Sequence, residues 1–572
     1  MTLSRREFVA AAAAGSVLVA DWIEAAPAAP GRYAAAFRAI DAMVARYMRE
    51  MNAPGLTLAI ADRDAVLRVA TYGLSDADRR EPVRPEHLFH IGSISKSFAA
   101  IALLQLRDEG KLDLHAPVTR YLPWLRIEPR EITTHHLLTH SSGLPDSLYV
   151  FPSDPSATHT AGFTPGAHFH YSNLGYGMLG LLVETLDGRA YPEVIRARIL
   201  EPLGMNASAP SISADIRGRT AASYNNYLDD RPYTRHGRLA HAPAIVLDNA
   251  AGCIASTPGD MGLYLRMLAR RGSPLLGEKS FADMSAPHIR LADGAEPGYG
   301  YGLFIDTLDE HPVVRHTGGM VSFMSAMHID LTDGLGAFAS VNAQQGYRPN
   351  PVTTYALRAI RAANANKPMP DPPPPNSPAT IQGAGDLAGV YVLDCGGCAA
   401  AFKSGSEAAA VQKIEFAANG DALFLVHDGK RIPVEIAGGE MYVNHPDFAL
   451  YPFFFEREKK EGGRAISVGH GARWWTAESY AGPRTFDVPD AWRGYQGHYR
   501  SEDPWVGSGR IVLRQGKLWV GGTAALRAVN ANTFRFVEPE HNPEWIQFLQ
   551  IVNGKARHMK VSGTDLYRAE VR

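Results

Sequence analysis

The stretch "HLFHIGSISKSFAA", residues 87–100, indicates both the fold and the chemistry of this chain. A short apolar run leads through Gly92 into small and apolar residues, which predict a buried helix that ends at Gly110. Ser93 stands at the start of this helix, and Lys96 follows three residues later. Because positions i and i+3 share one helix face, the two side chains are expected side by side. Ser93 is therefore a candidate nucleophile.

The overall composition is that of a globular protein with several domains. The chain has 572 residues, of which 45% are hydrophobic and 20% charged, and this is too long for a single core. Its 57 Lys and Arg nearly balance 59 Asp and Glu, and no basic block could follow a phosphate backbone. We expect no nucleic-acid partner, and the sequence leaves the oligomeric state open.

The N-terminal segment, residues 1–28, reads as a targeting segment. The run "SRREFVAAAAAGSVLVA" has paired arginines followed by an apolar stretch, and it resembles a twin-arginine export signal. An uncleaved membrane anchor is the alternative, although the apolar run is shorter than the roughly 20 residues that a spanning helix needs. We expect a periplasmic or secreted protein with no membrane span after signal cleavage.

The three cysteines are too few for a disulfide scaffold. Cys395 and Cys398 form "CGGC", for which a local disulfide is favoured over a metal site because structural zinc normally takes four ligands; a redox role is a weaker alternative. Cys253 reads as a small buried hydrophobic residue. We expect no metal and no organic cofactor.

Changes in composition divide the mature chain into four parts. Residues 31–365 mix helical and strand patterns, residues 366–385 form a proline-rich linker, and residues 386–487 and 488–572 are β-rich. "LAGVYVLD" (387–394) and "YQGHYRSE" (495–502) share a Gly-x-Tyr core, which indicates two β-domains of similar size. One larger β-domain with a coincidental match is the alternative.

Three more segments follow the Ser-x-x-Lys pattern in order. They are "ITTHHLLTHSSGLPD" (132–146), "PGAHFHYSNLGYGMLG" (165–180) and "VVRHTGGMVSFMS" (313–325). Together these motifs resemble the serine β-lactamase and penicillin-binding protein superfamily, in the branch with class C β-lactamases, D-aminopeptidases, D,D-carboxypeptidases and esterases. The resemblance implies an α/β (α+β) catalytic domain, with an antiparallel sheet flanked by helices. It also implies that two small antiparallel, lipocalin-like β-barrels follow this domain.

The resemblance also implies a role for each motif residue. Ser93 is the expected nucleophile, with Lys96 as its cationic neighbour. Tyr171 is the expected general base, and Asn173 positions the substrate amide. His316 and Gly318 belong to the motif that matches K-T-G, and Gly319 is expected to offer its N–H to the oxyanion together with that of Ser93. His316 replaces a lysine that helps hold a carboxylate, which makes efficient β-lactam hydrolysis unexpected.

The chemistry of this set can also be argued from the residues alone. A serine hydroxyl needs a base to take its proton as it attacks. Tyr171 could be that base if its pKa fell by about three units, which requires about 4 kcal/mol of phenolate stabilisation that a neighbouring ammonium can supply. Taken singly, Ser93 could be a helix cap, Lys96 a solvated charge and Tyr171 a packing residue; their joint occurrence favours catalysis.

Two other patterns are interpreted as structural. Gly175 and Gly180 belong to a G-x-G-x-x-G run, but the run lacks a βαβ setting and indicates close helix packing. His135, His136 and His140 lack matching acidic or cysteine ligands, so we interpret them as part of a helix near the catalytic centre.

The sequence therefore predicts an exported serine hydrolase that forms an acyl-enzyme on amide or peptide substrates. A peptidase resembling D-aminopeptidases is the leading interpretation, because its appended β-domains could border the site and restrict substrate size. An esterase of the same fold is the first alternative. A penicillin-binding sensor and a non-catalytic envelope-binding protein are the others.

Overall fold

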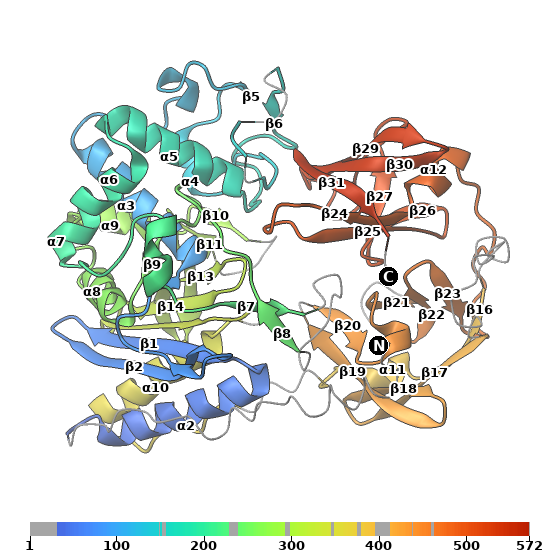
Figure 1. The fold of residues 1–572 in the computed structure, drawn as a ribbon, viewed down its shortest axis with the longest axis horizontal. Coiled ribbons are helices and arrows are strands. Elements are labelled where there is room, and N and C mark those ends of the chain that lie inside the picture. Colours follow the sequence, from blue (N-terminus) through green and yellow to red (C-terminus); the bar gives the residue numbers. More distant parts are fainter. Residues whose placement is uncertain are drawn as a thin grey trace.

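The computed structural model describes residues 31–147, 149–151, 156–227, 238–291, 298–344, 348–373, 379–394, 412–437, 439–458 and 463–570. The expected export signal and the Cys395–Cys398 pair lie outside these residues. Figure 1 shows a mixed α/β unit beside two β-barrels, which confirms the expected fold class.

The N-terminal unit, residues 31–365, is named the catalytic unit here for its expected role, and it is built on an antiparallel main sheet whose strand order is β10-β11-β12-β13-β14-β15-β1-β2-β3. Strand β1 (Gly55–Asp62) lies between β15 and β2 and is almost entirely buried, because helices cover both faces of the sheet. The other strands are β2 (Val66–Asp76), β3 (Glu81–Pro82), β10 (Ile289–Arg290), β11 (Gly298–Tyr299), β12 (Phe304–Leu308), β13 (His311–Gly319), β14 (Met324–Asp330) and β15 (Leu335–Val341).

Helices cover both faces of this sheet. On one face α2 (Ala34–Met51) and α10 (Asn350–Asn364) share an apolar core with the strands, and on the other face lies a larger core that includes α3 (Ser95–Asp108), α5 (Asn173–Asp187) and α8 (Pro258–Ala269). The apolar spacing of residues 33–51 matches α2, the alternation within residues 55–73 matches the β1–β2 hairpin, and the helix expected to end at Gly110 is present as α3. Shorter helices are α4 (Thr134–Leu138), α6 (Tyr191–Ile195), α7 (Glu201–Leu203) and α9 (Glu278–Met284).

Three pairs of short strands lie around the main sheet. They are β4 (Phe89–His90) with β9 (Ala255–Ser256), β5 (Ile127–Glu128) with β6 (His159–Thr160), and β7 (Tyr224–Asn226) with β8 (Leu239–His241). The β4–β9 pair leads directly into the Ser93 turn and so fixes the start of α3.

The C-terminal part forms two closed antiparallel barrels. The first contains β16 (Gly389–Leu393), β17 (Lys413–Asn419), β18 (Ala422–His427), β19 (Lys430–Ala437), β20 (Glu440–Val443), β21 (Phe453–Arg457), β22 (Ala465–His470) and β23 (Arg473–Thr476). The second contains β24 (Gly497–Arg500), β25 (Ser508–Arg514), β26 (Lys517–Val520), β27 (Ala524–Ala528), β28 (Thr533–Phe536), β29 (Trp545–Val552), β30 (Lys555–Val561) and β31 (Thr564–Ala569). Closure leaves neither barrel an open strand edge.

The Gly-x-Tyr repeat opens both barrels in the same way. A short helix, α11 (Ala384–Leu387) or α12 (Asp490–Tyr495), precedes the first strand of each barrel. The repeat tyrosine, Tyr391 or Tyr499, is buried and its hydroxyl donates to the carbonyl four residues earlier, at 2.8 Å and 2.7 Å respectively. The repeated sequence therefore encodes one structural device used twice.

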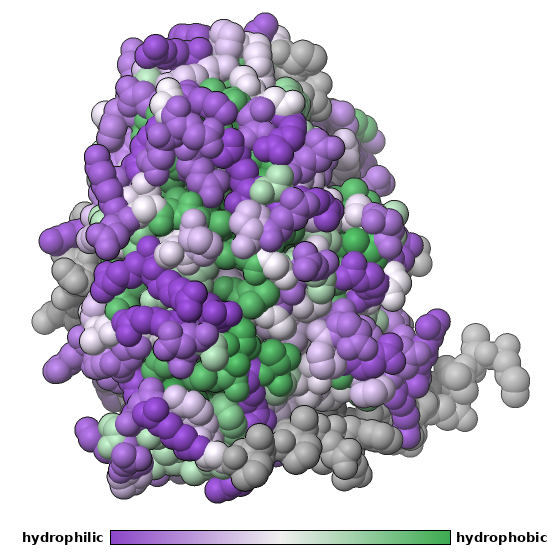
Figure 2. Space-filling model, turned by 90° about the vertical axis from the view of Figure 1, so that its left-hand side faces the viewer, coloured by the Kyte–Doolittle hydropathy of each residue, from purple (hydrophilic) through white to green (hydrophobic). Residues whose placement is uncertain are grey.

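Figure 2 views the molecule from the side of the catalytic unit, where hydrophilic residues surround smaller hydrophobic areas. Among the described residues, no helix combines the length and apolar character that crossing a membrane requires.

Candidate active site

The Ser93 turn lies against the C-terminal end of β13 in the main sheet. Ser93 belongs to a 3₁₀ turn, Gly92–Ile94, that continues directly into α3. Gly92 has φ +54° and packs so tightly on β13 that an added Cβ would lie 2.9 Å from the nitrogen of Gly319. Glycine is needed here for both reasons. The turn therefore brings Ser93 beside the end of β13.

Lys96 is fully buried and directed at Ser93. Its Nζ donates to Ser93 Oγ at 3.0 Å, to Asn173 Oδ1 at 2.7 Å and to the Ala251 carbonyl at 2.7 Å. Burial lowers the pKa of Lys96 to about 7, while Asp146 raises it and Arg348 lowers it further. Lys96 is thus not a solvated charge, and a substantial fraction of it is neutral near pH 7.

Tyr171 and Asn173 come from the start of α5. The hydroxyl of Ser172 accepts the Gly175 N–H at 3.2 Å and caps the helix, which fixes the residues on either side of it. Tyr171 is hydrogen-bonded to Ser93, and Lys96 Nζ lies 4.8 Å from the centre of its ring. The structure therefore brings Ser93, Lys96, Tyr171 and Asn173 into one cluster.

The pKa of Tyr171 differs from the sequence-based expectation. Loss of hydration raises this pKa above its usual value, and the hydrogen bond from Ser93 opposes that effect only partly. The expected lowering of the phenol pKa by Lys96 is wrong for this state of the protein. The reason is that burial penalises phenolate and ammonium alike, and it has already lowered the pKa of Lys96.

His316 lies on β13 and is also buried. Its Nε2 lies 3.1 Å from the Tyr299 hydroxyl, and its Nδ1 lies 2.6 Å from the Thr317 carbonyl. Burial, aided by the nearby Lys96 charge, lowers the pKa of His316 to about 3. His316 is therefore neutral near pH 7 and supplies no positive charge for a carboxylate.

Gly318 and Gly319 form the end of β13. A Cβ on Gly318 would lie 1.9 Å from the Ile91 carbonyl oxygen, so only glycine allows this strand to approach the Ser93 turn. Gly319 faces Arg348, whose guanidinium would lie 3.2 Å from an added Cβ. These two glycines set the spacing between the strand and the candidate nucleophile.

The structure adds three residues whose place in the site the sequence did not predict. Asp146 accepts the Asn173 backbone N–H at 2.8 Å, Arg348 brings a cation to Gly319, and the His140 ring packs at a tilt of 33° against the Tyr171 ring with centroids 4.2 Å apart. Nδ1 of His140 also accepts the Ser172 N–H at 3.0 Å. Asp146 ends one of the quoted motifs, and His140 was noted only as a structural residue. No sequence signal marks Arg348.

The structural interpretations of the remaining motifs agree with the contacts, with the exception of His140. Gly177 and Gly180 of α5 pack against Val150 and Ala250, as expected for close helix packing. His135 and His136 lie in α4 as expected, but His140 does not: the helix ends at Leu138, and His140 has φ +55°, which a helix does not allow. Cys253 is buried and free, as expected.

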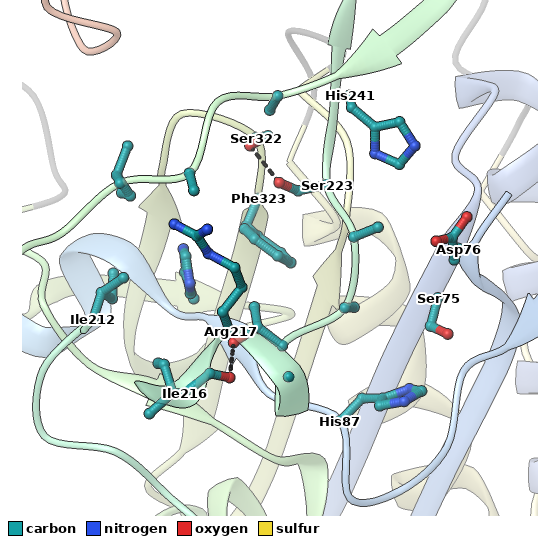
Figure 3. A pocket seen from close by; sticks show the side chains of 18 of the residues that line it. Ser75, Asp76, His87, Ile212, Ile216, Arg217, Ser223, His241, Ser322 and Phe323 are labelled. Carbon is teal, nitrogen blue, oxygen red and sulfur yellow. Dashed lines mark hydrogen bonds between the residues drawn. The ribbon is translucent and has the colours of Figure 1, made fainter. Parts of the chain in front are cut away.

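A separate hollow of about 410 Å³ lies elsewhere in the catalytic unit, and Ser93 does not line it. Figure 3 shows Arg217 and Phe323 on one side of this hollow and His87, Ser75 and Asp76 on the other. It is distinct from the cluster around Lys96.

The fold and the Ser93 cluster agree with a match to known proteins. The family model named Beta-lactamase matches residues 40–362, more than half of the chain, so the chain belongs to this family of serine hydrolases. It is 30% identical over 381 residues to "Esterase EstB" of Burkholderia gladioli, a match covering 56% of this chain and 94% of that protein. It is 25% identical over 294 residues to "Penicillin-binding protein 4*" of Bacillus subtilis (strain 168), covering 47% of this chain and 64% of that one.

A solved structure extends the similarity past the catalytic unit. The octameric penicillin-binding protein homologue from Pyrococcus abyssi matches with a TM-score of 0.54 and 25% sequence identity. The match covers 77% of this chain and 99% of that one, which is more of this chain than the family model matches.

Proposed function

We propose that this protein is an exported serine hydrolase that forms an acyl-enzyme on Ser93 and cleaves amide bonds of small peptides, as D-aminopeptidases do. The observation that carries the proposal is the hydrogen bond from the buried Lys96 to Ser93 Oγ at 3.0 Å. A lysine whose pKa is lowered to about 7 can hold or accept a proton near neutral pH.

In the proposed acylation step, neutral Lys96 accepts the Ser93 proton as the serine oxygen attacks the substrate carbonyl carbon. Tyr171 stays protonated, because its pKa is raised, and it orients Ser93 by hydrogen bonding. Lys96 then returns its proton to the leaving amine, with Tyr171 as the relay. This scheme assigns to Lys96 the basic role that the resemblance gave to Tyr171.

The negative charge formed on the carbonyl oxygen needs fixed donors. We assign these to the backbone N–H groups of Ser93 and Gly319, since Gly92 packs directly on Gly319. Donors fixed in advance cost no reorganisation during the reaction. Asn173 orients the substrate amide, and water then hydrolyses the ester on Ser93.

Contacts from the second barrel support a small substrate. Asp503 of this barrel hydrogen-bonds to Tyr149, and the ring of His541 stacks on His168 with centroids 3.9 Å apart. Both partners belong to the segment of the catalytic unit that precedes Tyr171. A barrel seated there limits the space beside Ser93, which favours a peptidase of short substrates over one of long chains.

An esterase is the second candidate. The observation that favours it is the 30% identity to a protein named an esterase, which this chain matches over 94% of its length. An ester has a better leaving group than an amide and needs less help from Tyr171 and Lys96.

Intact-protein mass spectrometry with a fluorophosphonate probe tests the proposal. We expect a covalent adduct on the wild type and none on Ser93→Ala, with both proteins folded. Matched amide and ester substrates of one D-amino acid then separate peptidase from esterase. Equal labelling of the wild type and of Ser93→Ala would contradict the assignment of Ser93. A lasting penicillin adduct without turnover would indicate a sensor.

A further inference from the structure

The second barrel contacts the catalytic centre through one carboxylate. Glu544 directly precedes β29, and its Oε1 accepts the backbone N–H of Asp146 at 2.6 Å. The same oxygen lies 2.7 Å from Nε2 of His170. A single barrel oxygen therefore joins two separate segments of the catalytic unit.

One of these segments contacts a member of the Ser93 cluster, and the other contains two of its members. Asp146 accepts the Asn173 backbone N–H at 2.8 Å, and its other oxygen lies 3.4 Å from Asn173 Nδ2. Asn173 Oδ1 in turn accepts the Lys96 ammonium at 2.7 Å. His170 is the residue immediately before Tyr171. Glu544 thus contacts Asp146, which binds Asn173, and it also contacts His170, which is the chain neighbour of Tyr171.

The barrel holds Glu544 in a fixed position. The Ser562 hydroxyl donates to its second carboxylate oxygen, and the Glu544 N–H donates to Asn542 Oδ1 at 2.9 Å. The Glu544 side chain is only 16% exposed. A carboxylate fixed by its own domain can fix in turn the segments that it contacts.

We propose that Glu544 is a positioning residue: the second barrel holds Asp146 and His170 through it, and so sets the position of Asn173 and Tyr171 relative to Lys96 and Ser93. The inference rests on the proposed function. It makes the catalytic centre dependent on a docked second barrel.

Other contacts across the same interface do not lead to Lys96. Tyr149 bonds to Asp503, and Pro543 packs so closely on Gly162 that an added Cβ would lie 2.5 Å from the Pro543 Cα. Removing one of these contacts weakens docking of the barrel. It leaves intact the series of hydrogen bonds that leads from Glu544 through Asp146 and Asn173 to Lys96. Tyr149→Phe is therefore a matched control.

The test compares full-length Glu544→Ala, Glu544→Gln, Ser562→Ala and Tyr149→Phe with the wild type. The readouts are the rate of fluorophosphonate labelling at Ser93, kcat and KM on one small amide or ester, and the melting temperature. We expect Glu544→Ala to lower the labelling rate and kcat about 10-fold with little change in KM, because misplaced groups slow the reaction more than they weaken binding. Glu544→Gln keeps an acceptor for the Asp146 N–H and is expected within about 3-fold of wild type.

Ser562→Ala leaves the catalytic unit untouched and only loosens Glu544, so it carries the test if Glu544→Ala does not fold. We expect its labelling rate and kcat to lie between those of Glu544→Gln and Glu544→Ala. Wild-type labelling and kcat in folded Glu544→Ala overturn the inference. An equal loss in Tyr149→Phe also overturns it, because the effect would then be general loosening of the interface.

The two proposals fail in different ways. If the wild type shows no Ser93-dependent labelling, the proposed function is overturned and this inference with it. If the wild type is labelled at Ser93 and every Glu544 and Ser562 variant matches it, only the positioning role is overturned.

Discussion

Gly318 lies directly against the carbonyl oxygen of Ile91, where an added Cβ would be only 1.9 Å from that oxygen. Ile91 precedes the turn that presents Ser93, and Gly318 lies near the end of β13 beside this turn. A Cβ at that distance would clash, so the two backbones can lie this close together only because residue 318 has no side chain. The spacing between candidate nucleophile and strand is thus set by the absence of one carbon atom.

Gly318→Ala is therefore expected to move β13 away from the Ser93 turn. A shift of this kind displaces the Gly319 N–H, and we expect the rate of Ser93 labelling to fall about 100-fold. The control is Gly259→Ala in α8, where the nearest atom to an added Cβ is 3.9 Å away. If Gly318→Ala were labelled at the rate of the control, the close packing of β13 on the Ser93 turn would not matter for the reaction, which contradicts this prediction.

The lowered pKa of Lys96 predicts a pH dependence of acylation. Lys96 accepts a proton only when neutral, so the labelling rate is expected to rise about tenfold per pH unit below about 7 and to level off above it. His316, whose pKa is lowered to about 3, adds no further limb between pH 5 and 9. A rate measured from pH 5 to 9 that stays flat would exclude Lys96 as the base.

Replacing Lys96 is expected to abolish activity and to raise the stability of the fold. Its pKa is lowered from 10.5 to about 7, so the unfolded chain binds the proton more tightly and the free energy of unfolding rises with pH between these values. Below pH 7 the full cost of burying the ammonium applies. We expect Lys96→Met to abolish labelling and to raise the free energy of unfolding at pH 7 by about 1 to 2 kcal/mol, after the lost hydrogen bonds are subtracted.

Denaturant unfolding at pH 7 and pH 10 checks the Lys96→Met prediction. The gain in the free energy of unfolding should be larger at pH 7 than at pH 10, because the cost of burying the Lys96 ammonium in the wild type decreases as pH rises. Lys111→Met, at an exposed lysine that pairs with Glu109 at 2.9 Å, is the control and is expected to change stability by less than about 0.5 kcal/mol. A loss of stability in Lys96→Met at pH 7 would show that the buried ammonium is well compensated.

Arg348 is expected to select substrates with a carboxylate near the reacting bond. It is the cation beside Gly319, whereas His316 is neutral. We expect Arg348→Ala to lower kcat/KM about 10-fold for an acidic substrate and to leave a neutral ester within about 2-fold. The control is Arg358→Ala on α10, which removes one of the two arginines that pair with Asp309. Equal losses for both substrates would assign Arg348 a structural role.

Much of the fold follows from local patterns in the sequence. The apolar spacing of residues 33–51 encodes α2, the alternation within residues 55–73 encodes the β1–β2 hairpin, and the Gly-x-Tyr repeat encodes the opening of both barrels. The Ser93–Lys96 contact was also predictable, because helix geometry fixes the spacing of residues three apart.

The tertiary structure decided what depends on burial and on distant segments. The pKa of Tyr171 is raised rather than lowered because the surrounding protein excludes water, which no local pattern records. Asp146, Arg348 and Glu544 reach the Ser93 cluster from separate parts of the chain. The sequence by itself determined the catalytic motif and the elements that carry it, since these depend on neighbouring residues. Only the tertiary packing, within the catalytic unit and between it and the second barrel, decided which charges surround that motif, because electrostatic effects depend on distance in space and on the exclusion of water.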